Sequence, residues 1–167
     1  MMENSVNDPY QTPTADVEVN IGDSKLSSVY KRFSAWGVVG LMIITLGFYG
    51  IYWLVNRTNK INAYIENPIS VSLMVLTCIF AVLSTVPTFF VVFSIYAPFI
   101  IEVAMLENVF SIVYLVLFYA WLFKFRNRIH SYVNAQKGTY AWAGPILTFF
   151  LSTLYLQYKI NKIIDNE

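Results

Sequence analysis

Few side chains in this sequence are of the types that enzymes use for chemistry. The chain has one histidine, His130, and one cysteine, Cys78, so it can form neither a histidine or cysteine cluster for a metal ion nor an intramolecular disulfide. The motifs GxSxG, HExxH and CxxC and the glycine-rich phosphate loop are all absent from the sequence. We therefore expect no catalytic residue, no cofactor and no metal, and we predict that the protein is not an enzyme.

Two acidic residues, Glu102 and Glu107, lie close to long apolar stretches. An ionisable side chain inside a membrane is a candidate functional site, because its charged form is costly there. The five-residue separation places the two carboxyl groups on different faces of a helix. They are interpreted either as carboxylates at a water interface or as a candidate ion pathway for protons or cations.

A basic stretch, KFRNRIH, follows the third apolar segment and contains Lys124, Arg126, Arg128 and His130. Anionic lipid head groups attract each basic residue near the surface by about 1 kcal/mol. We interpret the four residues as a lipid-facing basic collar that anchors a helix end. The alternative is regulated docking of a lipid or a protein through Arg126, Arg128 and His130.

Four glycines recur in the first apolar segment, at Gly37, Gly40, Gly47 and Gly50. On one continuous helix they would fall within about 140° of one another, and small residues let helices approach closely in lipid. We expect this face to serve helix packing. A second interpretation makes Gly47 and Gly50 the turn of a re-entrant hairpin that presents the nearby tyrosines to a head group or a partner.

Long apolar segments must position these residues. Hydrophobic residues make up 57% of the 167 and charged residues only 13%, whereas about a quarter of the residues are charged in a typical soluble protein. The segments cover about 35–55, 70–93, 100–123 and 140–158. Each is about as long as a span of the hydrocarbon layer requires. We predict an all-α integral membrane protein with a single membrane domain over 29–167, preceded by a disordered polar tail over 1–28.

The basic residues are compatible with two topologies of these segments. Four full spans would place six Lys and Arg residues on one face and five on the other, which is no bias. If the first and fourth segments are re-entrant or interfacial hairpins, all 11 lie on one face. Charge therefore favours two spans plus two hairpins, whereas segment length and the flanking aromatic residues favour four spans, and both remain open.

The first and fourth segments also resemble each other. Aligning Thr45 with Thr148 brings Tyr52 opposite Tyr155, and the sequence Asn-Lys-Ile follows in both segments. Similarity of this kind is typical of duplicated membrane units. We predict an internal repeat.

The stretch TLGFYGIYW at 45–53 resembles the hallmark of an uncharacterised family of small prokaryotic membrane proteins, domain of unknown function 4234. In that family a Thr-x-Gly-x-Tyr-Gly-x-Tyr-Trp core ends an apolar run and precedes an Asn-bearing stretch. The matching residues are Thr45, Gly47, Tyr49, Gly50, Tyr52, Trp53 and Asn59, with Tyr155, Tyr158 and Asn161 in a similar closing stretch. The resemblance implies the cytoplasmic (inner) membrane of a bacterium and a multi-pass protein, and it implies no activity.

These observations favour a non-catalytic membrane protein that binds a membrane partner or organises lipid through the glycine face and the basic collar. The expected partners are membrane lipids and a membrane protein or a second copy of the chain. The net charge of +1 gives no reason to expect nucleic acid. One alternative is a small transporter or channel that uses the two glutamates or the hydroxyls of Thr77, Ser84, Thr85 and Thr88. Another is an immunity or stress protein against a membrane-directed toxin.

Overall fold

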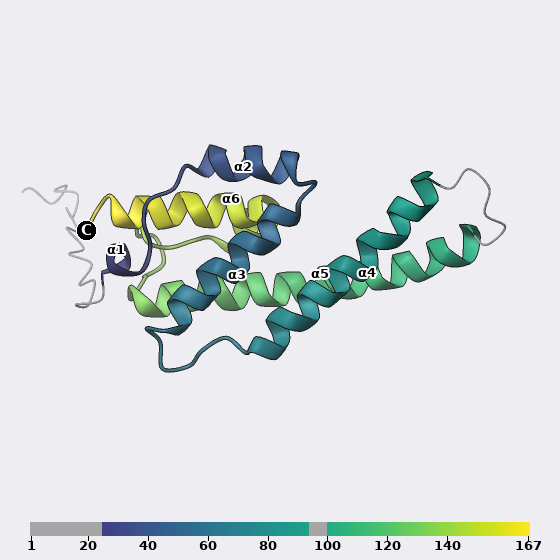
Figure 1. The fold of residues 1–167 in the computed structure, drawn as a ribbon. Helices are drawn as coiled ribbons and strands as arrows, with labels where there is room; N and C mark the ends of the chain where they lie inside the picture. The colour runs from purple at the N-terminus through teal and green to yellow at the C-terminus, as the bar shows by residue number, and fades with distance from the viewer. Residues whose placement is uncertain (1–24, 94–99) are drawn as a thin grey trace, which may run out of the picture.

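The structure is a computed structural model that describes residues 25–93 and 100–167, with side chains described outside 88–104. Every regular element in these ranges is a helix, which confirms the predicted all-α class (Figure 1). The helices are α1 (Leu26–Val29), α2 (Ala35–Ile44), α3 (Phe48–Asn62), α4 (Val71–Phe93), α5 (Ile100–Tyr132) and α6 (Pro145–Ile164).

The first apolar segment, predicted over about 35–55 either as one span or as a hairpin, consists of two helices. Helix α2 ends at Ile44 and α3 begins at Phe48. Between them Leu46 has φ 50° and Gly47 φ 92°, which are left-handed conformations that terminate a helix and favour glycine. The chain therefore reverses at 45–47, and the glycines of this segment do not share the face of a single helix.

Thr45 holds this turn together. Its hydroxyl donates to the carbonyl of Leu41 at 2.7 Å and accepts from the backbone N–H of Tyr49 at 2.8 Å. The N–H groups of Leu46, Gly47 and Phe48 donate to carbonyls of residues 42–45. Backbone N–H groups from 45 to 50 thus all have acceptors, which is the requirement for a turn placed away from water.

Helices α4 and α5 pack side by side and extend away from the other helices (right in Figure 1). Helix α4 agrees with the predicted segment 70–93, whereas α5 continues nine residues beyond the predicted end at 123. Among the described residues, one helical stretch, Met105–Tyr132, is long and apolar enough to cross a membrane, and 11% of its apolar window is buried. The apolar parts of α2 and α4, Ala35–Ile44 and Val71–Pro87, are shorter.

Helix α6 begins at Pro145, five residues later than predicted, and continues to Ile164. Proline at the first helical position costs little, because that N–H has no helical acceptor. Ser152, with φ 41°, interrupts the helix. Beyond this interruption, Tyr155 accepts a hydrogen bond from the N–H of Gly144 at 3.1 Å, and Lys159 donates to the carbonyl of Tyr140 at 3.0 Å. The connection before α6 therefore runs antiparallel to its second half.

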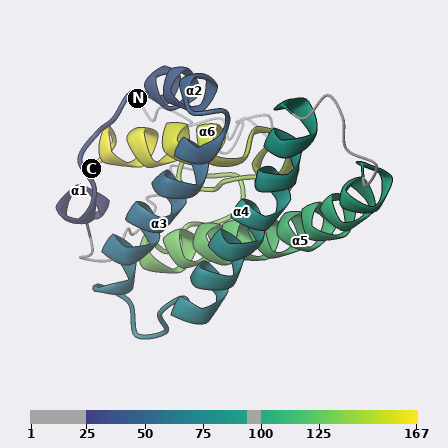
Figure 2. The same cartoon turned by 45° about the vertical axis from the view of Figure 1, so that its right-hand side comes forward.

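The buried core lies at the end of the molecule opposite the tips of α4 and α5 (left in Figure 1; Figure 2). It joins α1 to the C-terminal halves of α3, α5 and α6. The fully buried large side chains include Leu26, Tyr30, Leu54, Ile61, Trp121, Phe125, Leu156 and Ile160. The predicted tail over 1–28 was too long, because α1 is part of this core; the disorder predicted for 1–24 lies outside the described residues.

Candidate functional site

A buried polar network connects α3 to α6 in this core. The Oε1 atom of Gln157 accepts from Trp53 Nε1 at 2.8 Å and from Arg57 Nη2 at 2.9 Å. Trp53 and Arg57 are one helical turn apart, so both side chains lie on the same face of α3. Gln157 is fully buried, and its amide oxygen is therefore the acceptor that keeps an indole N–H and a guanidinium hydrogen-bonded away from water.

The amide nitrogen of Gln157 holds the extended connection between α1 and α2. Gln157 Nε2 donates to the carbonyl of Phe33 at 3.2 Å and to Asn161 Oδ1 at 2.8 Å. Asn161 Nδ2 donates to the same Phe33 carbonyl at 2.6 Å, and its Oδ1 accepts from the N–H of Phe33 at 3.3 Å. The backbone of Phe33 is thereby fixed against α6.

The guanidinium of Arg57 is a buried cation that contacts the amide oxygen of Gln157 and two aromatic rings. Its guanidinium carbon lies 4.9 Å from the Tyr30 ring centre and 5.9 Å from that of Trp53. Among the described residues no carboxylate is within salt-bridge distance of it. Burial lowers the pKa of Arg57 and raises the pKa of Tyr30, because the charged form of each group loses hydration. The local charge at Arg57 is positive and uncompensated.

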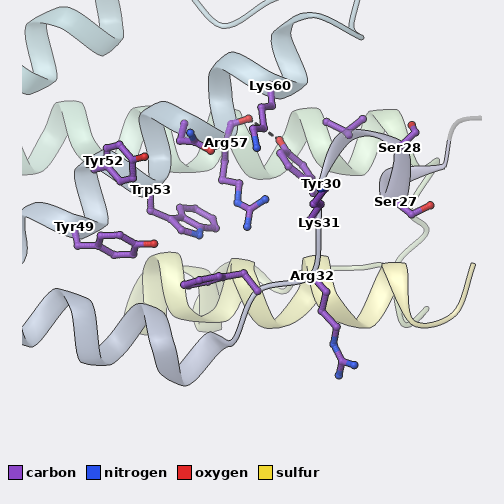
Figure 3. A pocket seen from close by; sticks show the side chains of 13 residues that line it. Ser27, Ser28, Tyr30, Lys31, Arg32, Tyr49, Tyr52, Trp53, Arg57 and Lys60 are labelled. Carbon is purple, nitrogen blue, oxygen red and sulfur yellow. Dashed lines mark hydrogen bonds between the residues drawn. The ribbon is translucent and has the colours of Figure 1, made fainter.

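A pocket of about 390 Å³ opens beside this network, between residues 27–33 and α3 (Figure 3). Figure 3 places Tyr49 and Tyr52 at one end of it, Ser27 and Ser28 at the other, and Arg57 between them. Four of the lining residues are basic and none is acidic: Lys31, Arg32, Arg57 and Lys60 carry the charge. We refer to this cavity as the basic aromatic pocket.

The C-terminal residues fix the outer wall of the basic aromatic pocket. The Glu167 carboxylate accepts from the N–H of Leu26 and, at 2.9 Å, from that of Ser27. Arg32 Nη2 lies 3.2 Å from Asp165 Oδ2. Arg32 is therefore already paired, whereas Lys31 and Lys60 are exposed and available to a ligand.

The composition of this pocket suits binding of an anion. Lysine and arginine bind phosphate and carboxylate oxygens, and tyrosine rings at one end can contact an apolar group. The described residues contain no group of three or more His, Cys, Asp or Glu side chains that could hold a metal ion. The arrangement provides positive charge and aromatic surface, and its lining contains no carboxylate or imidazole to act as a base.

The hallmark stretch at 45–53 supplies both the turn and the pocket. Thr45 and Gly47 form the turn. Tyr49, Tyr52 and Trp53 line the basic aromatic pocket. From the other predicted positions, Tyr155 and Asn161 hold connections against α6, as described above, whereas Asn59 is exposed on α3.

The four glycines have separate environments. A Cβ atom at Gly50 would lie 3.3 Å from Met42 Cε and 3.8 Å from Thr153 Oγ1, so Gly50 lets α2 and α6 approach α3. Gly37 is in the first turn of α2, capped by Ser34, and nothing lies within 4 Å of a Cβ at Gly40 or Gly47. The four glycines therefore do not share one packing face, because the chain reverses at 45–47, and Gly47 lies in the turn that was the second interpretation of this segment.

The predicted lipid-facing collar is only partly at the surface. Lys124 is exposed and Arg128 half-buried, but Arg126 and His130 are buried. Arg126 Nε donates to the carbonyl of Ala143 at 2.6 Å, and His130 Nε2 accepts from the N–H of Ala143 at 2.9 Å. These two side chains therefore hold the connection before α6. The prediction that they face lipid is wrong.

Trp142 covers the side chains of Arg126 and His130. The His130 ring stacks on Trp142 with 4.5 Å between ring centres, and the Arg126 guanidinium lies 5.2 Å from that ring. The histidine accepts through Nε2, so it is the neutral tautomer with its proton on Nδ1. Spacing in the sequence gave no reason to pair this histidine with a backbone group 13 residues away.

The residues of the candidate ion pathway lie on α4 and α5. Glu107 is half-buried on α5, while the side chains of Glu102 and Thr88 lie outside the described residues. Thr77 donates to the carbonyl of Leu73 at 2.7 Å, and Thr85 donates to carbonyls of its own helix. Ser84 likewise donates to Ala81 at 2.9 Å.

Sequence reasoning missed Arg57 and Gln157. A signal for Gln157 existed, since it is an amide within an otherwise apolar segment and buried polar side chains are normally hydrogen-bonded. Nothing local indicated that its partners would lie on α3.

The family model described as a domain of unknown function, DUF4234, matches residues 33–131. No curated protein and no solved structure matches the chain. The matched range covers more than half of the chain and contains the turn, the pocket side of α3 and the α4–α5 pair. The chain belongs to the DUF4234 family.

Proposed function

We propose that this member of the DUF4234 family is a non-catalytic, multi-pass protein of a bacterial cytoplasmic membrane that organises anionic lipid on the cytoplasmic face. The observation that carries the proposal is the separation of charge from apolar surface. All 11 Lys and Arg residues belong to the core end of the molecule, and the helix surfaces beyond it expose apolar side chains.

Contacts among the helices support a common end for these charges. Thr58 on α3 accepts from Trp121 Nε1 on α5 at 3.0 Å, and Arg57 bonds to Gln157 on α6. The basic C-terminal parts of α3, α5 and α6 therefore lie together. One basic face and no basic residue at the opposite end is the distribution expected of a cytoplasmic face.

In this proposal α4 and α5 cross the membrane and α2–α3 enters it as a re-entrant hairpin. The tip of that hairpin, Leu46 to Phe48, lines a cavity of about 130 Å³ together with Ala81 and Tyr114. Tyr114 precedes Lys124 by ten residues, or about 15 Å of helix, which is about half of the hydrocarbon thickness. The exposed side chains near the tip, Ile44 and Leu46 among them, are apolar, and the N–H groups of the turn all have acceptors.

We further propose that the segment 140–164 is a second, related hairpin. Thr148 donates its hydroxyl hydrogen to the carbonyl four residues earlier, at 2.8 Å, as Thr45 does in the first hairpin. Each threonine is followed within four residues by a residue with positive φ, Leu46 and Gly47 in one case and Ser152 in the other. These shared features support an internal duplication, in which both copies place their polar ends on the same face.

The lipid preference can be measured with spin-labelled lipids and the full chain in phosphatidylcholine bilayers. We expect the chain to immobilise a larger fraction of spin-labelled phosphatidylglycerol than of spin-labelled phosphatidylcholine at low salt. The difference should shrink at about 1 M salt, where the Debye length is about 3 Å. Equal immobilised fractions of the two lipids at low salt would contradict the proposed function.

A further inference from the structure

We propose that the basic aromatic pocket binds the phosphate head group of one anionic phospholipid. The inference rests on the proposed function and makes it specific, because it assigns the lipid to a defined cavity instead of to the basic face as a whole. Three features of the pocket support it: an uncompensated buried cation, a gradient from aromatic to basic lining, and a position beside the proposed re-entrant hairpin.

The buried cation is Arg57. A guanidinium has five N–H donors, and one of them is used by Gln157. The group lines the pocket between Tyr52 and Lys60 (Figure 3), with aromatic rings on its faces. A buried charge is costly unless it is paired, so an anion in the pocket would supply the pairing that the described side chains do not.

The gradient runs along α3. Tyr49 and Tyr52 lie in the first turns of the helix, next to the apolar tip, and their ring centres are 5.7 Å apart. Lys60 lies about two turns further on, at the basic end of the molecule. A phospholipid placed in this cavity would have its glycerol and acyl carbons beside the tyrosines and its phosphate beside Arg57, Lys31 and Lys60.

The size of the cavity agrees with a head group and not with a whole lipid. Small-molecule sites have volumes of about 300–1,000 Å³, and this pocket measures about 390 Å³. The acyl chains would then extend past Tyr52, whose side chain is 60% exposed. The lipid would thus be held by its phosphate and remain part of the bilayer.

The test is calorimetric titration of the full chain in an uncharged detergent with dihexanoyl-phosphatidylglycerol, compared with dihexanoyl-phosphatidylcholine and inorganic phosphate at equal ionic strength. We expect one phosphatidylglycerol per chain. We expect phosphatidylcholine to bind about tenfold more weakly or not at all, because its head group has no net charge for the basic side chains to attract. Phosphate as strong as the lipid would overturn the proposal by assigning the pocket to a soluble anion.

The variant that tests the pocket is Lys31→Gln with Lys60→Gln, since both side chains are exposed and their loss leaves the core intact. We expect affinity for phosphatidylglycerol to fall about thirtyfold, because each basic residue near an anion contributes about a fivefold factor. The control, Lys124→Gln with Lys137→Gln, removes the same charge from exposed positions outside the pocket. It should change affinity by less than about threefold.

The outcomes separate the pocket from the proposed function. Equal losses in the two double variants, or several weak sites per chain, would mean that the basic face binds lipid diffusely; the pocket proposal then fails while the proposed function stands. No binding of phosphatidylglycerol here, with no preference for spin-labelled phosphatidylglycerol in bilayers, would contradict both.

Discussion

At the residue scale, single side chains fix the places where this chain departs from a continuous helix. Gln157 accepts from both Trp53 and Arg57, and Thr45 closes α2 while opening α3. A hydrogen bond to a charged group contributes about 1.5–3 kcal/mol to stability. Polar residues in the apolar segments therefore hold particular backbone and side-chain groups in place.

Gly47 allows a direct test of the turn. Its φ of 92° is a conformation that other residues rarely adopt, and no atom lies within 4 Å of the position a Cβ would take. We expect Gly47→Ala to lower the free energy of unfolding by about 1–2 kcal/mol through backbone strain alone. Thermal unfolding in an uncharged detergent, followed by circular dichroism, measures the change.

Gly40→Ala is the matched control for that variant. Gly40 also has nothing within 4 Å of its Cβ position, but it lies inside α2. Because alanine is favoured over glycine in a helix by about 1 kcal/mol, Gly40→Ala should leave stability unchanged or raise it. Equal effects of the two substitutions would mean that the chain does not reverse at Gly47.

At the scale of the elements, a side-chain amide that bonds both the N–H and the carbonyl of one residue fixes the connection between two helices. Asn62, the last residue of α3, donates from Nδ2 to the carbonyl of Ile69 at 2.9 Å and accepts the N–H of Ile69 at 2.9 Å. This pair of hydrogen bonds closes the connection from α3 to α4. It fixes the start of α4 relative to the hairpin.

Hydrogen exchange at the Ile69 amide tests this connection. In Asn62→Ala both hydrogen bonds are lost, and we expect Ile69 exchange to become at least about tenfold faster, which corresponds to about 1.4 kcal/mol of local stability. Asn62→Asp keeps an acceptor for the Ile69 N–H and should retain most of the protection. Unchanged exchange in the alanine variant would show that other contacts hold the loop.

The sequence predicted the α-helical class and the limits of α4, because an uninterrupted apolar run of this length is typical of a membrane helix. It also indicated a turn at Gly47 and Gly50 as one alternative, because glycine is the residue most often found in tight turns. It did not predict the pocket, because Phe33, Arg57 and Gln157 are far apart in the chain and meet only when α3 and α6 pack. The burial of Arg126 and His130 was missed for the same reason, since both bind Ala143 across a loop.

At the scale of the whole molecule, the proposed topology places both ends of the described chain and every basic residue on one side of the membrane. Leu106 lies about 18 residues before Lys124 on α5, or roughly 27 Å, which is close to the thickness of the hydrocarbon layer. The two alternatives of four spans and of two spans plus two hairpins differ in where Ser27 and Asn166 lie. They agree on Leu106.

The most direct measurement is labelling of single cysteines, in a Cys78→Ser background, with a membrane-impermeant maleimide in intact and permeabilised cells. The positions are Ser27, Asn59, Leu106, Lys137 and Asn166. The proposed topology predicts that Leu106→Cys is labelled in intact cells and that the other four are labelled only after permeabilisation. Labelling of Ser27→Cys and Asn166→Cys in intact cells, together with Leu106→Cys, would contradict it and would establish four full spans.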